Sequence, residues 1–227
     1  MSTLRSLAVV LVITTLFAGT PALAASNEAV KRNNFGAELA KQGRLEEALS
    51  EFRLAVQADP RFATAQMNLA YTYEKLNRGD EAIAAYKKTI ELDPRNRTAF
   101  NNLGVLYMDK GLYDEALQVI EQGLKVDPND GTLQKNLEIA KTNLAHVNER
   151  DTEIAAARKQ AELLPKDPRA AYNLARAYSA FHMQDQALEW LDKAFQLGFK
   201  DIPLLRDDPA LSGLRQDPRY TRLMEGR

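Results

Sequence analysis

The chain has 227 residues and is nearly neutral, with 30 lysines and arginines against 31 aspartates and glutamates. Basic and acidic residues are interspersed along the sequence, which argues against a surface for binding nucleic acid. There is no cysteine, and this excludes disulfides, thiolate catalysis and cysteine-based metal sites.

Residues 1–24 have the layout of a secretory signal peptide. Arg5 precedes an apolar run at residues 7–18, and the small residues Ala22 and Ala24 follow a break at Pro21. The run of about 12 residues is shorter than the roughly 20 that a membrane-spanning helix needs. We expect cleavage after Ala24, export across the inner membrane and, in a Gram-negative source, a periplasmic protein without stable membrane insertion. An uncleaved membrane anchor is the alternative.

The rest of the chain repeats itself every 34 residues. The dipeptide Asp-Pro recurs at residues 59–60, 93–94 and 127–128, and an asparagine stands eight residues after each proline, as Asn68, Asn102 and Asn136. Pro165 and Asn173 keep the same offset after a three-residue lengthening. Self-similarity at a constant period predicts a solenoid in which each unit packs only on its neighbours.

Each period carries the pattern of two amphipathic helices. In residues 98–128, Leu103, Leu106 and Tyr107 form one apolar stripe, and a second stripe follows the turn at Gly111. Pro128 ends the second helix because proline cannot continue it. One such hairpin cannot bury both stripes, so it needs neighbours of the same kind.

These repeats resemble the tetratricopeptide repeat family. The matching residues are the small residues Gly36, Ala70, Gly104 and Ala175, the aromatics Tyr73, Tyr107 and Tyr178, the alanines Ala48, Ala82, Ala116 and Ala187, and the prolines Pro60, Pro94, Pro128 and Pro165. The resemblance implies an all-α fold, a right-handed superhelical solenoid of about five helix-turn-helix repeats. We expect it at residues 25–201, with repeats at about 29–62, 63–96, 97–130, 131–167 and 168–201.

The fourth repeat and the tail depart from this pattern. Glu138 and Lys141 replace the expected small and aromatic residues, and residues 148–152 are the only plausible break in the fourth repeat. Its hairpin has either lengthened helices or a loose turn. In residues 202–227, Asp208 and Asp217 each precede a proline and are expected to cap short helices. These helices are expected to cover the hydrophobic end of the solenoid; a partner-binding latch is the alternative.

No pattern of catalytic or metal-binding residues is present. His146 and His182 fall in different repeats, each in or near an expected turn. The sequence has no His-Glu-x-x-His, no phosphate-binding glycine loop and no Gly-x-Ser-x-Gly. We therefore expect neither enzyme activity, nor a cofactor, nor a metal ion.

One set of residues is not required for packing. An asparagine occupies the same place in the first helix of all five repeats, although asparagine is a poor residue for a helix interior. The set comprises Asn34, Asn68, Asn102, Asn136 and Asn173. Threonines stand four residues before three of them, at Thr64, Thr98 and Thr132. The neighbours expected on the same face are Met67, Tyr71, Lys75, Asn101, Val105, Met108, Lys135, Ile139, Arg169, Tyr172 and Arg176.

In the family this face lines the concave groove. Some members, such as the protein O-linked N-acetylglucosamine transferases, have a similar asparagine ladder that grips a peptide main chain. A carboxamide offers both a donor and an acceptor, so it can pair with an extended segment whatever its sequence. The alternative is that these amides bond within the solenoid or tolerate solvent. The carboxylate clamp of chaperone-binding relatives is not reproduced. Asn68 matches its second-repeat asparagine, but Asn33 and Ala37 stand at its first-repeat positions, and Thr98 and Asn102 replace its third-repeat basic residues.

The sequence thus predicts a non-catalytic scaffold or adaptor that binds an extended peptide or a partner helix in its concave groove. Two alternatives remain open. The first is a structural subunit of a cell-envelope assembly, such as secretion, pilus or division machinery, that uses its convex or end surfaces. The second is an enzyme, or an enzyme accessory, with an unrecognised site.

Overall fold

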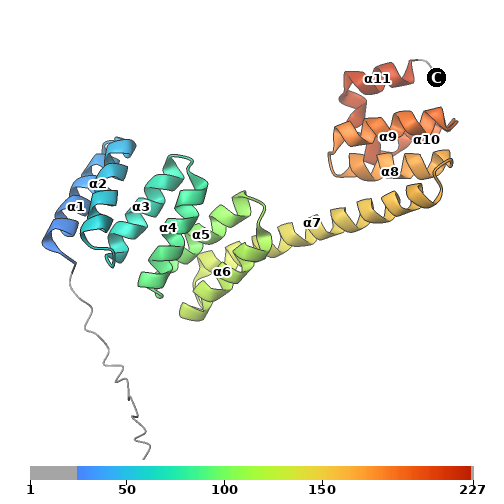
Figure 1. Cartoon of the computed structure of the whole chain (residues 1–227). Coiled ribbons are helices and arrows are strands. Elements are labelled where there is room, and N and C mark those ends of the chain that lie inside the picture. Colours follow the sequence, from blue (N-terminus) through green and yellow to red (C-terminus); the bar gives the residue numbers. More distant parts are fainter. Residues whose placement is uncertain (1–24, 226–227) are drawn as a thin grey trace, which may run out of the picture. The chain divides into compact units, whose positions relative to one another are not determined.

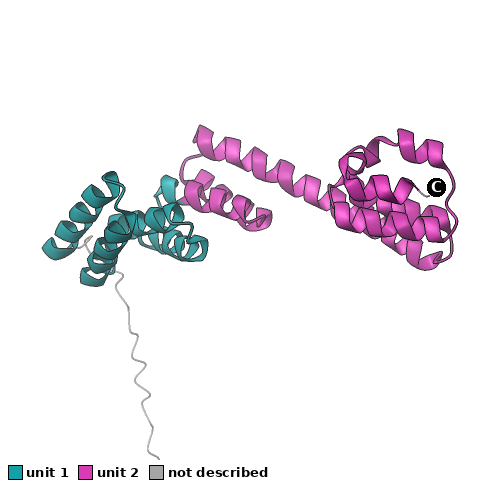
Figure 2. Cartoon of the chain, turned by 90° about the horizontal axis from the view of Figure 1, so that it is seen from above, with its two compact units in different colours: residues 1–99 teal, residues 100–227 magenta. Residues whose placement is uncertain are grey.

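The computed structural model describes residues 25–225, and this range contains helices and no strand (Figure 1). The chain divides into two compact units, residues 1–99 and residues 100–227 (Figure 2). The expected signal peptide, residues 1–24, lies outside the described residues.

The first unit holds two helical hairpins and the start of a third. Its helices are α1 (Asn27–Lys41), α2 (Leu45–Ala58), α3 (Ala63–Lys75), α4 (Gly79–Leu92) and the first residues of α5 (Arg97–Asp109). The second unit continues with α6 (Tyr113–Val126), α7 (Gly131–Leu163), α8 (Pro168–Ala180), α9 (Gln184–Gln196), α10 (Ile202–Asp207) and α11 (Pro218–Met224). Two short 3-10 turns, η1 (Pro209–Leu211) and η2 (Leu214–Gln216), lie between α10 and α11.

The four hairpins share one turn chemistry. The second residue after the first helix has a positive φ in each, at Gly43, Asn77, Gly111 and His182. The next residue returns its backbone N–H to the carbonyl five residues earlier, for example from Arg44 to Leu39. This is the Schellman arrangement, which reverses the chain and satisfies helix-end carbonyls. Glycine and asparagine adopt this conformation at low cost, and histidine tolerates it better than most residues.

Small residues that recur at the repeat spacing allow the two helices of a hairpin to approach. A Cβ added to Gly36 would lie 2.9 Å from the ring of Phe52, and one added to Gly104 would lie 2.6 Å from Cγ1 of Ile120. The matching alanines Ala48, Ala82, Ala116 and Ala187 have no exposed surface. The packing positions expected from the family are therefore confirmed.

The fourth repeat is a single helix. α7 runs without interruption from Gly131 to Leu163, through the residues where the sequence left a break possible. Ala145 stands 34 residues after Gly111, at the place where the other hairpins turn. A left-handed conformation costs a non-glycine residue about 1–2 kcal/mol, whereas alanine is the best helix former. The helix therefore continues where the hairpins reverse.

A second feature of the sequence also disfavours a hairpin here. Glu138 stands 34 residues after Gly104, where a second helix would pack closely, and its side chain is exposed. A charge at that place cannot be buried without a partner. The C-terminal part of α7 instead packs on α8, where Arg158 donates a 2.7 Å hydrogen bond to Tyr178.

The C-terminal segment covers the end of the second unit. Leu205, Leu211 and Leu214 are completely buried against α8 and α9, and Tyr220 is 7% exposed. Asp208 and Asp217 accept backbone N–H bonds at the starts of η1 and α11, as the sequence predicted. The expected helix around Leu211 and Leu214 is in fact two 3-10 turns, preceded by α10.

Candidate peptide-binding face

We call the side of each first helix that carries the repeated asparagine the inner face. In the first unit, α1 and α3 meet along this face through two amides. Nδ2 of Asn68 donates a 2.8 Å hydrogen bond to Oδ1 of Asn33. Asn33 is 6% exposed, while the repeated residue Asn34 beside it is exposed. Asn68 therefore pairs with Asn33 and not with Asn34, the residue at the repeat position.

The second unit has the same arrangement between α5 and α7. Nδ2 of Asn136 donates to Oδ1 of Asn101 at 2.7 Å, over the same separation of 35 residues. Nδ2 of Asn101 then donates to Oδ1 of Asn102 at 3.2 Å. Asn102 and Asn136 are half-buried. Three amides therefore form one chain of hydrogen bonds on this face.

These bonds orient the amides and use part of their capacity. The Asn33 bond takes one N–H of Asn68, so its carbonyl oxygen is left as an acceptor. The sequence-based alternative of bonding within the solenoid therefore describes part of what the amides do. An amide held in one orientation loses less entropy when it binds a ligand than a mobile one does.

An aromatic residue and a lysine follow Asn68 along α3. Tyr71 has 48% of its surface exposed, and Nζ of Lys75 lies 4.9 Å from the centre of its ring. Thr64, one turn before Asn68, is also exposed. A carboxamide, an aromatic ring and an ammonium group thus lie along one side of a single helix.

The other expected residues occupy separate places. Thr98 is exposed near the start of α5, and Thr132 and Lys135 are exposed in the first turns of α7. Asn173 is exposed on α8. About 40 Å of continuous helix separates Asn136 from the end of α7, where the chain turns into α8. The structure therefore does not bring Asn173 next to Asn136.

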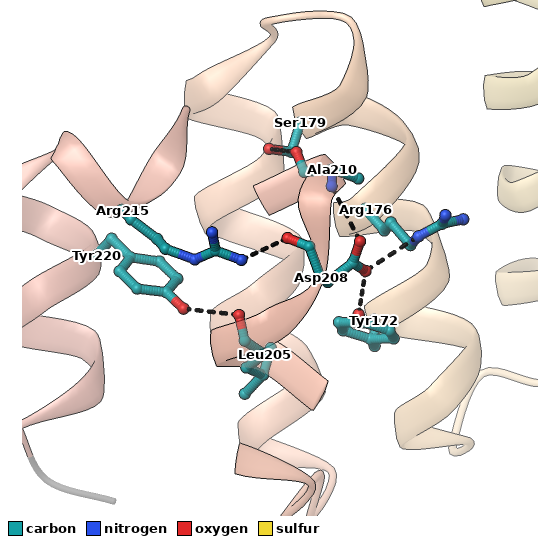
Figure 3. Close-up of polar contacts among 8 residues, drawn as sticks. All are labelled: Tyr172, Arg176, Ser179, Leu205, Asp208, Ala210, Arg215 and Tyr220. Carbon is teal, nitrogen blue, oxygen red and sulfur yellow. Dashed lines mark hydrogen bonds and ion pairs between the residues drawn. The ribbon is translucent and has the colours of Figure 1, made fainter. Parts of the chain in front are cut away.

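On α8 the C-terminal segment contacts Tyr172, Arg176 and Ser179 (Figure 3), while the repeated residue Asn173 stays exposed. The Tyr172 hydroxyl and Nε of Arg176 both donate to Oδ2 of Asp208, the latter at 3.0 Å. The hydroxyl of Ser179 donates to the carbonyl of Ala210 at 2.7 Å. Sequence reasoning placed Tyr172 and Arg176 on this face but missed Asp208 and Ser179 as their companions. The burial of Asp208 is the observation that identifies the contact, and no sequence pattern indicates it.

The contact changes the acidity of both partners. The pKa of Tyr172 lies well above its usual value because burial disfavours the phenolate and because the hydroxyl donates to Asp208. Burial by itself raises the pKa of Asp208. Hydrogen bonds from Tyr172, from the amide of Ala210 and from Arg176 outweigh that effect, so the pKa of Asp208 is lower than usual.

Other candidate chemistry is sparse in residues 25–225. No three histidine, aspartate or glutamate side chains in this range gather as a metal-binding group. His146 lies within the helix α7 and not near a turn, so that expectation was wrong; it contacts the ring of Phe181, while His182 occupies a turn as expected. A cavity of about 370 Å³ beside Phe195, Phe199 and Lys200 contains no acid–base pair. Across the same described range, no helix has both the length and the apolar character that a membrane crossing requires.

Comparison with known families agrees with the helical pattern. Models described as tetratricopeptide repeat match residues 33–96, 77–138 and 168–193. Most of α7 lies between the matches at residues 77–138 and 168–193. A comparison with curated proteins found no match.

Solved structures share the fold. The first TPR of Spaghetti (RPAP3), bound to the HSP90 peptide SRMEEVD, is 23% identical with a TM-score of 0.50, over 53% of this chain and 95% of its own. The Sgt2 TPR domain from Aspergillus fumigatus is 20% identical with a TM-score of 0.51, over 58% of this chain and 88% of its own. A MamA RS-1 double mutant is 20% identical with a TM-score of 0.50, over 77% and 96% respectively.

Proposed function

Because the chain belongs to the tetratricopeptide repeat family, we propose that it acts without catalysis as a protein-interaction scaffold. The inner face of α1 and α3 holds an extended peptide segment of the partner. The observation that carries this proposal is the Asn68 amide, which Asn33 holds in place beside the exposed ring of Tyr71.

Each group on this face has a part in binding. The carbonyl oxygen of Asn68 accepts a backbone N–H of the peptide, which gives affinity without dependence on peptide sequence. The Tyr71 ring offers a flat apolar surface at a low cost in conformational entropy. Lys75 beside the ring favours a segment with an acidic side chain or a carbonyl at that place.

The hydrogen-bonded chain of Asn101, Asn102 and Asn136 provides the same chemistry in the second unit. The first TPR of Spaghetti, which has the same fold, was solved with a peptide bound, so hairpins of this kind can hold one. Asn68 matches the second-repeat asparagine of the clamp in chaperone-binding relatives, but the clamp's basic residues are not matched here. We therefore expect a different peptide class from SRMEEVD.

The proposal also includes the location of the protein, which is inferred from the sequence of residues 1–24. Their signal-peptide pattern supports the proposal that the protein binds its partner outside the inner membrane, in the periplasm of a Gram-negative source.

The proposal can be tested with peptides selected from a phage-displayed random library against residues 25–227. Dissociation constants of selected peptides are then measured by fluorescence anisotropy. Tyr71→Ala and Asn68→Ala are each expected to weaken binding about tenfold, a loss of about 1.4 kcal/mol. Binding to SRMEEVD is expected to be undetectable.

The matched control is Asn173→Ala, which removes an exposed asparagine of the same repeat position from α8. It should leave affinity unchanged. Thermal midpoints of all variants are measured in parallel, because Asn68 also supports Asn33. Unaltered affinity in Tyr71→Ala, or an equal loss in the control, would contradict binding on α1 and α3.

A further inference from the structure

Three polar side chains of α8 bind the C-terminal segment of the same chain. Tyr172, Arg176 and Ser179 follow one another at steps of four and three residues, so they lie on one side of the helix. All three contact the short segment from Asp208 to Ala210 (Figure 3).

The contacts divide into a side-chain part and a main-chain part. The Tyr172 hydroxyl and the Arg176 guanidinium both donate to one carboxylate oxygen of Asp208. The Ser179 hydroxyl donates to the main-chain carbonyl of Ala210. The other carboxylate oxygen accepts the N–H of Ala210 at 2.9 Å, which caps the turn η1. The site therefore recognises an aspartate at the start of a helical turn, together with the main chain that follows it.

Packing of the tail does not require this carboxylate. The apolar burial comes from Leu205, Leu211 and Leu214. The side chain of Asp208 is 5% exposed, so its carboxylate has lost most of its water. A desolvated charge is costly unless it is bound by well-placed donors. Neighbouring Asp207, with 72% of its side chain exposed, pays no such cost.

We propose that the side of α8 formed by Tyr172, Arg176 and Ser179 is a binding site for an aspartate-capped helical turn, and that residues 208–210 occupy it as an intramolecular ligand. Occupation in cis closes this face to other peptides, because the effective concentration of a tethered ligand exceeds that of a free competitor. A free segment that fits has the same chemistry, namely aspartate followed by a proline-initiated turn. The tail of a second copy is one such segment. This site is built from residues of the second unit alone, so the proposal does not depend on the α1 and α3 face of the first unit.

The test uses the full chain with a protease recognition sequence inserted after the exposed residue Lys200. The cut chain is mixed with a fluorescein-labelled synthetic peptide that corresponds to residues 201–227, and anisotropy measures exchange. The labelled peptide should bind the cut chain and not the uncut chain. Asp208→Asn in the peptide should weaken binding about tenfold or more, whereas Asp207→Asn should leave it within about twofold.

A second measurement uses the uncut chain, so it tests the proposal even if the cut chain does not stay folded. In the uncut chain, Asp208→Asn and Arg176→Gln should each lower the urea midpoint, and the double variant should fall no further than the worse single one. Asp207→Asn should not shift the midpoint. Equal binding of the Asp208→Asn peptide, equal binding to the uncut chain, or additive effects of the two substitutions would overturn the proposal.

Discussion

Asn68 bonds to Asn33, the residue next to the one that shares its place in the repeat. The same offset recurs in the second unit, where Asn136 bonds to Asn101. Asn68 and Asn136 therefore each bond to the first helix of the preceding hairpin, one residue off the repeat position. In both cases the residue at that place is itself an asparagine.

Removal of the Asn68 amide should destabilise the first unit. Asn68→Ala leaves the buried oxygen of Asn33 without its donor, and we expect the free energy of unfolding to fall by about 1–2 kcal/mol. Asn33→Ala should cost a similar amount, and the double variant should cost less than the sum. Urea unfolding measures all three. Asn34→Ala, at an exposed site, should change stability by less than about 0.5 kcal/mol, and additive effects would show that the bond contributes nothing.

The close approach of α5 and α6 predicts the effect of one added methyl group. In Gly104→Ala the new Cβ would stand 2.6 Å from Ile120, whose side chain has no exposed surface to move into. We expect overpacking to lower stability by about 1–3 kcal/mol, although alanine returns up to about 1 kcal/mol of helix propensity. Gly131→Ala is the control, since nothing lies within 4 Å of its added Cβ. A thermal midpoint of Gly104→Ala at or above that of the control would contradict this account.

The hairpins and α7 differ in backbone conformation at the turn position, which has a positive φ in the hairpins and is helical in α7. Gly111 has φ +72° and nothing within 4 Å of an added Cβ, so Gly111→Ala should cost about 1 kcal/mol or more from the backbone. Ala145→Gly, 34 residues later, should also destabilise by about 1 kcal/mol, because there the residue is helical. Calorimetry of Gly111→Ala and Ala145→Gly measures both changes in stability. A stabilising Ala145→Gly would indicate that α7 prefers a turn at this residue.

Acid should weaken the attachment of the C-terminal segment. The pKa of Asp208 is lower in the folded chain than in the unfolded chain, so the unfolded state binds more protons as the pH falls. The stabilisation is present above the unfolded value of about 4 and is lost as the pH drops through the folded pKa. Tyr172 and Arg176 are the groups of α8 that face this carboxylate.

Urea midpoints between pH 7 and pH 2 should therefore fall less steeply for Asp208→Asn than for the wild type. Asp207→Asn, which removes an exposed carboxylate, should follow the wild-type curve. If wild type and Asp208→Asn lose stability in parallel, the Asp208 contact does not contribute to the acid dependence.

Processing of the N-terminus can be measured directly. Ser26 caps α1 through the N–H of Ala29, and its own N–H lies 3.2 Å from Asp59, so cleavage after Ala24 would leave both contacts in place. Full-length protein expressed in a Gram-negative host should appear in the periplasmic fraction, and its intact mass should match a chain that begins at Ala25. Ala22→Arg should block processing, since the site requires a small residue there. A periplasmic product that retains Met1 would instead support the anchor.

The sequence predicted the hairpins because the information for them is local. Period, apolar stripes and turn residues all act within 34 residues, and Ala48, Ala82 and Ala116 are buried as expected. The straight course of α7 was also accessible from the sequence, through Ala145 and Glu138 at the turn and packing positions. Glu138 by itself left a lengthened hairpin possible, and the alanine at the turn position is the residue that excludes it.

Side-chain partners between elements were not accessible in this way. Asn33 pairs with Asn68 over 35 residues and Tyr172 with Asp208 over 36, and neither partner carries a local sign of the contact. The sequence by itself determined the family, the helical period and the face that the asparagines share, since helix geometry and turn chemistry depend on near neighbours. Only the tertiary structure decided which amides bond to each other and that the tail fills the face of α8. Those contacts depend on how separate helices pack, and packing is set by the whole chain.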